Sequence, residues 1–200
     1  MGHTLTSPPA ETASARTAQP PGQRLGSLIG GIFGLIYIEA NVGSLPHLWA
    51  TALQIAGAVV FAGLVALLVL ARGPHAAAGP GAQGGFGSRY WLVVAGEVAA
   101  IPAGAAVLGP AGLGHAVVAW VSVVVGAHFV VLAAIWRLQL FRRIGVAIAL
   151  CGVVGLVAAA VSAPAAMIAG VGALLPGMVL LAAGYSGAVG AIRRAHLGAH

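Results

Sequence analysis

Glu97 and His128 stand out because each is an ionisable residue within a long apolar segment. Glu97 follows Arg89 by eight residues, and His128 precedes Arg137 by nine. In helices both therefore lie about 12–14 Å from those arginines, at matching depth. An acid and an imidazole in contact can exchange a proton near neutral pH. We predict that they form a proton- or cation-responsive site, and the alternative is a hydrogen bond that only fixes two helices together.

Cys151 and Tyr185 fall in the same layer when their depth is counted in the same way. Cys151 follows Arg143 by eight residues, and Tyr185 precedes Arg193 by eight. Polar side chains within apolar spans normally face the bundle interior and find partners there. We therefore predict that both belong to the intramembrane polar site described above.

Pro102 and Pro176 lie inside apolar segments and are predicted to kink them. Each proline lacks the N–H that would bond the carbonyl four residues earlier, so the carbonyls of Val98 and Gly172 are predicted to be free. The kink at Pro102 would then expose a backbone acceptor beside Glu97.

A second polar group is predicted in the other half of the bundle. Glu39 precedes Pro46 by seven residues and Gln54 follows it by eight, so the two lie at comparable depth on a tight hairpin. We predict a hydrogen bond between them, and Asn41 is placed to pair with Tyr37 four residues earlier. This outer site is predicted to serve either packing or ion entry.

Other chemistry is not indicated. The sequence Gly184-Tyr185-Ser186-Gly187 resembles the GxSG nucleophile motif of rhomboid intramembrane proteases, but here the serine helix follows the histidine helix instead of preceding it. No spacing typical of metal ligands occurs, there is no nucleotide-binding loop, and the chain has no Asp. We predict a protein that is not an enzyme and holds neither metal nor cofactor.

The elements that position these residues follow from composition. The chain has 200 residues, of which 60% are hydrophobic and only 6% charged, and this excludes a soluble globular domain, a disordered protein and a disulfide scaffold. Six apolar segments are each long enough for a membrane-spanning helix: 26–45, 49–71, 91–109, 116–136, 144–163 and 167–190. The predicted fold class is all-α, with a disordered tail at 1–24, a six-helix transmembrane domain at 25–192 and a tail at 193–200.

The nine basic residues, all Arg, set the predicted topology. With six crossings, every Arg falls on one side of the membrane, and the positive-inside rule makes that side cytoplasmic. We predict three consecutive hairpins in the cell membrane, with both termini in the cytoplasm. Because the arginines are scattered in ones and twos, nucleic acid is not a predicted partner, whereas the lipid bilayer is.

Small and aromatic residues occupy regular positions. Glycines recur every fourth residue at 26, 30 and 34, and small residues do so at 183, 187 and 191, which predicts close helix packing within the chain or, as the alternative, a homo-oligomer interface. An aromatic belt with no binding role is predicted from Trp49 and Trp120 near the outer boundary and Tyr90, Trp91, Trp136 and Phe141 near the inner one.

Three stretches carry a resemblance: GGIFGLIYIEANVGSLP (30–46), RYWLVVAGEVAA (89–100) and WVSVVVGAHFVVLAAIWR (120–137). They resemble a group of six-helix integral membrane proteins of high-GC, actinobacterial-type bacteria that carries no assigned activity. The resemblance implies topology only. Two functions are therefore carried forward: a small proton- or ion-linked transporter or channel of unknown substrate, and a non-catalytic structural, sensory or assembly protein.

Overall fold

The computed structural model describes residues 21–70, 87–137 and 139–197. Within them the chain is all-α, with no strand, and six helices are long and apolar enough to cross a membrane. The predicted fold class and number of helices are thereby confirmed. The predicted domain ends differ from the structure, because the first helix begins at Pro21 and the last one continues to Leu197. Residues 1–20 of the predicted N-terminal tail lie outside the described residues.

The six segments begin and end close to the predicted positions. Five of them are single helices: α2 (Pro21–Asn41), α3 (His47–Leu70), α4 (Ser88–Leu108), α5 (Val117–Trp136) and α6 (Gln139–Ala160). Short 3-10 turns, η1 (Val42–Ser44) and η3 (Gly114–Ala116), follow α2 and precede α5. The sixth segment is composite and runs through α7 (Ala165–Ala169), the π-helical turn η4 (Gly170–Leu174) and α8 (Leu175–Leu197).

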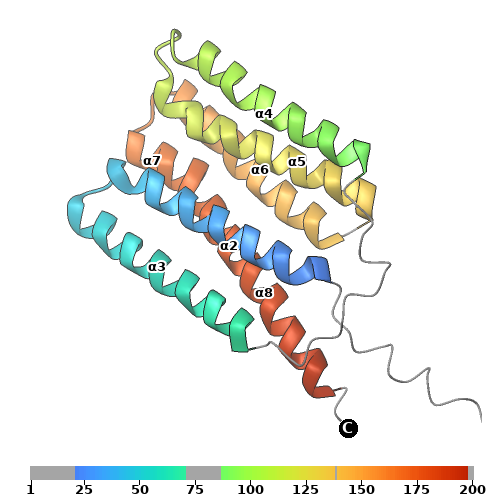
Figure 1. Ribbon diagram of the computed structural model, residues 1–200. Coiled ribbons are helices and arrows are strands. Elements are labelled where there is room, and N and C mark those ends of the chain that lie inside the picture. Colours follow the sequence, from blue (N-terminus) through green and yellow to red (C-terminus); the bar gives the residue numbers. More distant parts are fainter. Residues whose placement is uncertain (1–20, 71–86, 138, 198–200) are drawn as a thin grey trace, which may run out of the picture.

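The helices lie roughly alongside one another, with α4 at one edge of the bundle and α3 at the opposite edge (Figure 1). The two most extensive interfaces are those of α5 with α6 and of α2 with α8. By contrast, α3 packs mainly on α2, and α4 packs almost entirely on α5. The centre of the bundle is therefore built from α2, α5, α6 and the last segment.

Glycine allows close backbone approach at both main interfaces. Between α2 and α8, a Cβ on Gly34 would lie 2.7 Å from the carbonyl oxygen of Gly177, and a side chain at Gly187 would overlap Ser27. This confirms that members of both predicted small-residue ridges serve packing within the chain. Between α5 and α6, a Cβ on Gly126 would lie 2.6 Å from the carbonyl oxygen of Gly145. Neither backbone could approach so closely with a larger residue there.

The buried core lies where these four segments meet, and α4 adds only the partly buried Leu108 at its end. One central cluster joins buried residues of α2, α5, α6, η4 and α8: Tyr37, Val125, Ile148, Ala173 and Leu180. No residue of α4 is buried. The attachment of α4 to the bundle must therefore depend on specific contacts along α5.

Candidate functional site

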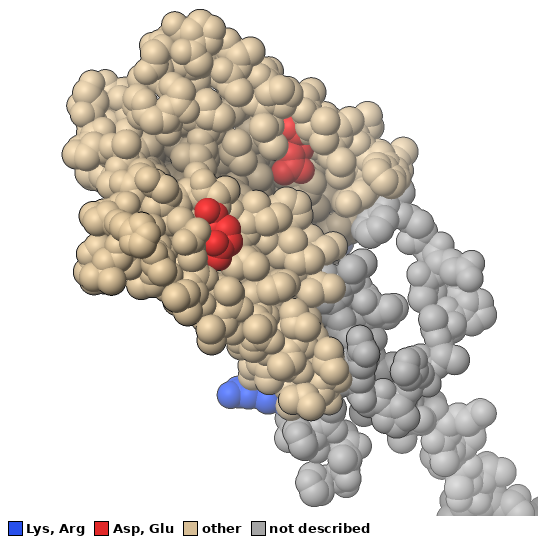
Figure 2. Space-filling model, turned by 60° about the vertical axis from the view of Figure 1, so that its left-hand side comes forward, with Lys and Arg blue, Asp and Glu red and all other residues tan. Residues whose placement is uncertain are grey.

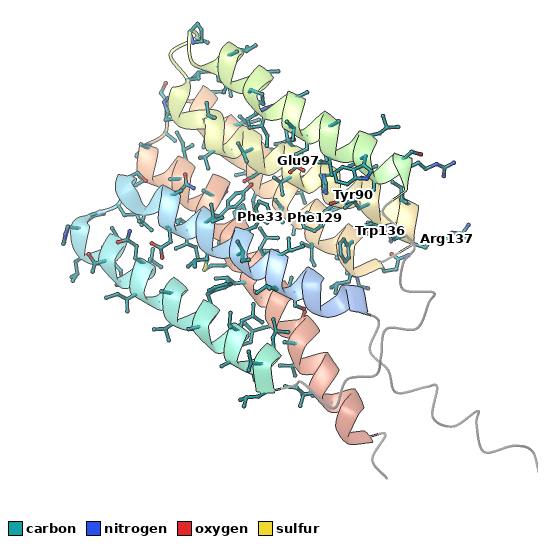
Figure 3. The ribbon with its side chains drawn as sticks, in the orientation of Figure 1. Phe33, Tyr90, Glu97, Phe129, Trp136 and Arg137 are labelled. Carbon is teal, nitrogen blue, oxygen red and sulfur yellow. The ribbon has the colours of Figure 1, made fainter. Side chains whose placement is uncertain are left out.

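Glu97 on α4 and His128 on α5 are in contact, as their matching depth predicts. Nδ1 of His128 lies 2.9 Å from Oε2 of Glu97, and the side chains are 14% and 22% exposed, respectively. Figure 3 shows Glu97 directed from α4 towards α5. The distance is that of an ion pair, but Nδ1 lacks a well-directed hydrogen bond, so the oxygen lies off the N–H direction. The contact therefore brings together a mostly buried carboxylate and a mostly buried imidazole, two kinds of group that can each bind a proton.

The pair is the middle member of three contacts that join α4 to α5. On one side of it, the rings of Tyr90 and Trp136 stack with centroids 6.1 Å apart. On the other, Nε1 of Trp120 donates a 2.9 Å hydrogen bond to the carbonyl oxygen of Ala100. We call these three contacts the α4–α5 seam. Each joins a polar or aromatic side chain of α5 to α4.

Trp120 has a packing role that the predicted aromatic belt did not include. Its indole is partly buried, bonds Ala100 and covers Gly104, where a Cβ would overlap the ring. The sequence does contain a signal for the seam. Tyr90, Glu97 and Gly104 recur every seven residues, the spacing that keeps side chains on one helix face.

A second polar group lies in the core beside the seam. The Ser122 hydroxyl donates a 2.5 Å hydrogen bond to the carbonyl oxygen of Gly172 in η4. That carbonyl is the one that Pro176 was predicted to free, so Ser122 supplies the missing donor. The buried Tyr37 hydroxyl lies near Ser122 and within electrostatic range of Glu97, but its geometry falls short of a hydrogen bond. Sequence reasoning missed Ser122 entirely.

The two prolines differ in their effect on the backbone. The helix α4 runs unbroken through Pro102 from Ser88 to Leu108. Pro176, by contrast, is the second residue of α8, which begins directly after the π-helical turn η4. The kinks predicted at the two prolines stay predictions, and the π-helical turn beside Pro176 is the backbone irregularity that the structure shows.

Two residues predicted for the site lie elsewhere. The Tyr185 hydroxyl donates a 2.7 Å hydrogen bond to the carbonyl oxygen of Val60 on α3, at the opposite edge of the bundle from α4. Cys151 on α6 is half-buried and forms no hydrogen bond with the pair among the described residues. Matching depth fixes the position of a residue along the helix axis but not the direction in which its side chain points. Tyr185 points towards α3, away from the Glu97–His128 pair.

The outer polar site is also only partly as predicted. Among the described residues, the hydrogen bond between Glu39 and Gln54 does not form, and both side chains are half-exposed. Asn41 does pair with Tyr37, but its amide donates 2.8 Å to the backbone carbonyl. The two acidic residues of the described chain, Glu39 and Glu97, lie apart on a largely uncharged face (Figure 2).

A cavity of about 630 Å³ lies at the end of the bundle that carries η1 and η3. Its polar lining includes Tyr37, Asn41, Ser44 and His115. Tyr37 thus lines this cavity and also lies within electrostatic range of Glu97. Tyr37 therefore lies between this cavity and the central core cluster, where it packs with Val125 of α5.

Ser186 and the remaining polar groups add no further site. The Ser186 hydroxyl donates to the carbonyl of Ala183 in its own helix, 2.8 Å away. In the described part of the chain, no three His, Cys, Asp or Glu residues gather as metal ligands would.

No protein-family model matches this sequence, and neither a curated protein nor a solved structure matches the chain. The six apolar helices are compatible with a multi-pass membrane protein. The role of the Glu97–His128 pair must therefore be argued from its own geometry.

Proposed function

We propose that this is an integral membrane protein in which Glu97 and His128 form the proton-exchange site of a small proton- or ion-linked transporter. The observation that carries the proposal is the 2.9 Å contact between a carboxylate and an imidazole inside two apolar helices. An ionisable residue at such depth costs about 2.5–3.5 kcal/mol on insertion scales, so a functional role is the first hypothesis.

The proposed topology has three consecutive hairpins with both termini in the cytoplasm. Its support is the placement of the arginines: Arg89 in the first turn of α4, Arg137 at the end of α5, Arg142 at the start of α6 and Arg193 near the end of α8. These helix ends lie at the same end of the bundle in Figure 1. The positive-inside rule assigns that end to the cytoplasm.

The proposed route runs from the 630 Å³ cavity to the pair. Tyr37 lines the cavity and has its hydroxyl beside Ser122, within electrostatic range of Glu97. Ser122 already donates to Gly172, and the buried Tyr37 hydroxyl has no hydrogen-bond partner among the described residues, so Tyr37 is the proposed group that passes a proton on. A proton or small cation entering the cavity would pass Tyr37 and reach the Glu97 carboxylate.

The test is proton flux into proteoliposomes driven by an imposed pH gradient. We expect Glu97→Gln to lower the flux at least tenfold and to leave expression and elution volume unchanged. Glu39→Gln is the matched control, because it makes the same chemical change at the other described acid and should retain flux. Wild-type flux in the Glu97→Gln variant would overturn the transport proposal.

A second candidate function is favoured by the packing of α4. Since α4 buries no residue, the seam contacts are its main attachment, and the pair would then serve only as a structural link. In that case wild-type proteoliposomes would show no flux above empty vesicles, and Glu97→Gln would change only the stability of the protein. The same experiment separates the two functions.

A further inference from the structure

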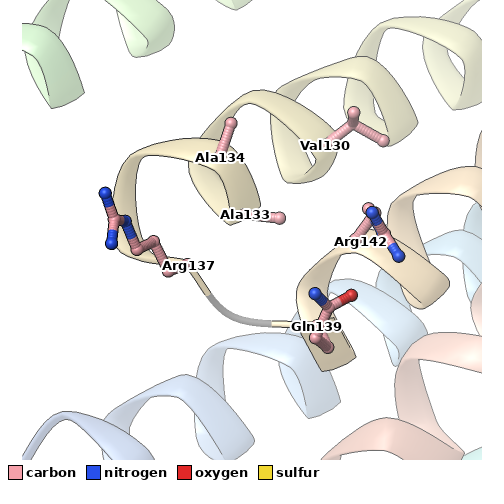
Figure 4. Close-up of a pocket in the computed structure, with 6 residues that line it drawn as sticks. All are labelled: Val130, Ala133, Ala134, Arg137, Gln139 and Arg142. Atoms are coloured by element: carbon pink, nitrogen blue, oxygen red, sulfur yellow. The ribbon is translucent and has the colours of Figure 1, made fainter.

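A second cavity lies at the arginine-rich end of the bundle, away from the cavity that Tyr37 lines. It has a volume of about 380 Å³ and is formed where α5 ends and α6 begins. The apolar lining comes from α5, whereas the polar side chains come from the end of α5 and the start of α6 (Figure 4). Its lining residues are Val130, Ala133, Ala134, Arg137, Gln139 and Arg142.

The charge of this cavity is positive. Arg137 and Arg142 lie on opposite sides of it in Figure 4, and both are exposed. The Glu97–His128 pair is the only ion pair among the described residues, so no carboxylate there neutralises either arginine. The end of α5 carries a partial negative charge and the start of α6 a partial positive one, and these offset each other at the cavity. The two guanidinium groups therefore determine its charge.

The backbone holds Arg137 in an unusual conformation at this place. Arg137 has φ 56° and ψ 36°, in the left-handed region, and its N–H caps α5 by bonding the carbonyl of Ala133. Glycine is the usual residue in such a cap, and an arginine there costs about 1 kcal/mol. The cap turns the chain so that Gln139 and Arg142 of α6 face the end of α5 across the cavity.

We infer that this cavity binds the headgroup of an anionic phospholipid. Guanidinium groups recognise phosphate oxygens through paired N–H donors, and the Gln139 amide adds a neutral donor. The apolar wall of Val130 and Ala134 would line the start of an acyl chain, which a free phosphate ion does not have. Basic pockets between helices near a membrane boundary are typical sites for such lipids.

The experiment measures lipid binding to the purified full chain in detergent by native mass spectrometry. The probes are dioleoyl phosphatidylglycerol, which is anionic, and dioleoyl phosphatidylcholine, which has the same acyl chains but no net charge. We expect phosphatidylglycerol to bind at least tenfold more tightly. Each arginine contributes about fivefold near an anionic headgroup, so the double variant Arg137→Gln/Arg142→Gln should bind roughly 25-fold more weakly.

The control is Arg143→Gln/Arg193→Gln, which removes the same charge from the same end of the bundle at exposed positions outside the cavity lining. It should change the dissociation constant less than about twofold. An equal loss in both double variants would show unspecific charge attraction and overturn the assignment.

Two further measurements address the acyl chain. Ala134→Leu fills the apolar wall without a change in charge and should also weaken phosphatidylglycerol binding. Inorganic phosphate at 100-fold excess should not displace the lipid, and displacement would identify a free phosphate site instead. Equal binding of the two lipids by the wild type would contradict the inference directly.

Discussion

The two sides of α5 are packed in opposite ways. Towards α6, Gly126 and Gly145 bring the two backbones so close that even a Cβ would overlap the neighbouring helix. Towards α4, the contacts are the side-chain pairs of the seam, and α4 itself buries no residue. Close backbone packing fixes α5 against α6, whereas α4 is held by a few side-chain contacts, one of which joins two ionisable groups.

This difference matters because lipid offers no hydrophobic drive for helix association. A glycine-lined interface gains dispersion energy over its whole length, and a single added methyl group disturbs all of it. A polar contact between membrane helices is worth only about 0.6 kcal/mol on average. The seam is therefore the weaker of the two attachments of α5.

The largest expected effect is on the α5–α6 interface. Gly126→Ala should lower the free energy of unfolding by about 1–3 kcal/mol, because the new Cβ meets the backbone of α6. Gly96→Ala on α4 is the control, since nothing lies within 4 Å of a Cβ there, and it should be neutral or stabilise by up to about 1 kcal/mol. Unfolding in a detergent titration measures both, and equal losses would refute the contrast between the interfaces.

An intermediate effect is expected in the core. Ser122→Ala should lower the free energy of unfolding by about 1–2 kcal/mol, because it leaves the Gly172 carbonyl without the donor that replaces the missing N–H of Pro176. Ser186→Ala removes a hydroxyl that bonds only its own helix and should change stability by less than about 0.5 kcal/mol. If the two variants are equally stable, the bond to Gly172 contributes nothing.

A smaller effect is expected at the seam. Trp120→Phe removes the hydrogen bond to Ala100 but keeps most of the ring, and should lower the free energy of unfolding by about 0.6–1.5 kcal/mol. The same unfolding titration applied to Trp49→Phe, at a side chain that is 65% exposed, should detect almost no change. A loss at Trp120 larger than that of Gly126→Ala would contradict the view that α4 is the weakly held helix.

Sequence reasoning located what depends on position along a helix. Apolar length predicts the six helices, and equal distance from the arginines brings Glu97 and His128 together. Sequence reasoning failed where the contacts of a residue depend on which side of the helix its side chain leaves. Tyr185 lies at the same depth as Glu97 and His128, but its hydroxyl bonds α3. The donor to Gly172 could not be predicted either, since Ser122 is 50 residues away and reaches it only through tertiary packing.

The central claim is that Glu97 and His128 act as one proton-exchange unit, and a double-mutant cycle of proton flux tests it most directly. The four proteins are the wild type, Glu97→Gln, His128→Gln and the double variant, reconstituted at equal density under the same pH gradient. Residues that act as a unit give strongly non-additive effects. We predict that both single variants and the double variant lose flux to the same low level. Wild-type flux in either single variant would contradict the account. So would partial losses of flux in the two single variants that multiply in the double variant, because independent residues give that result.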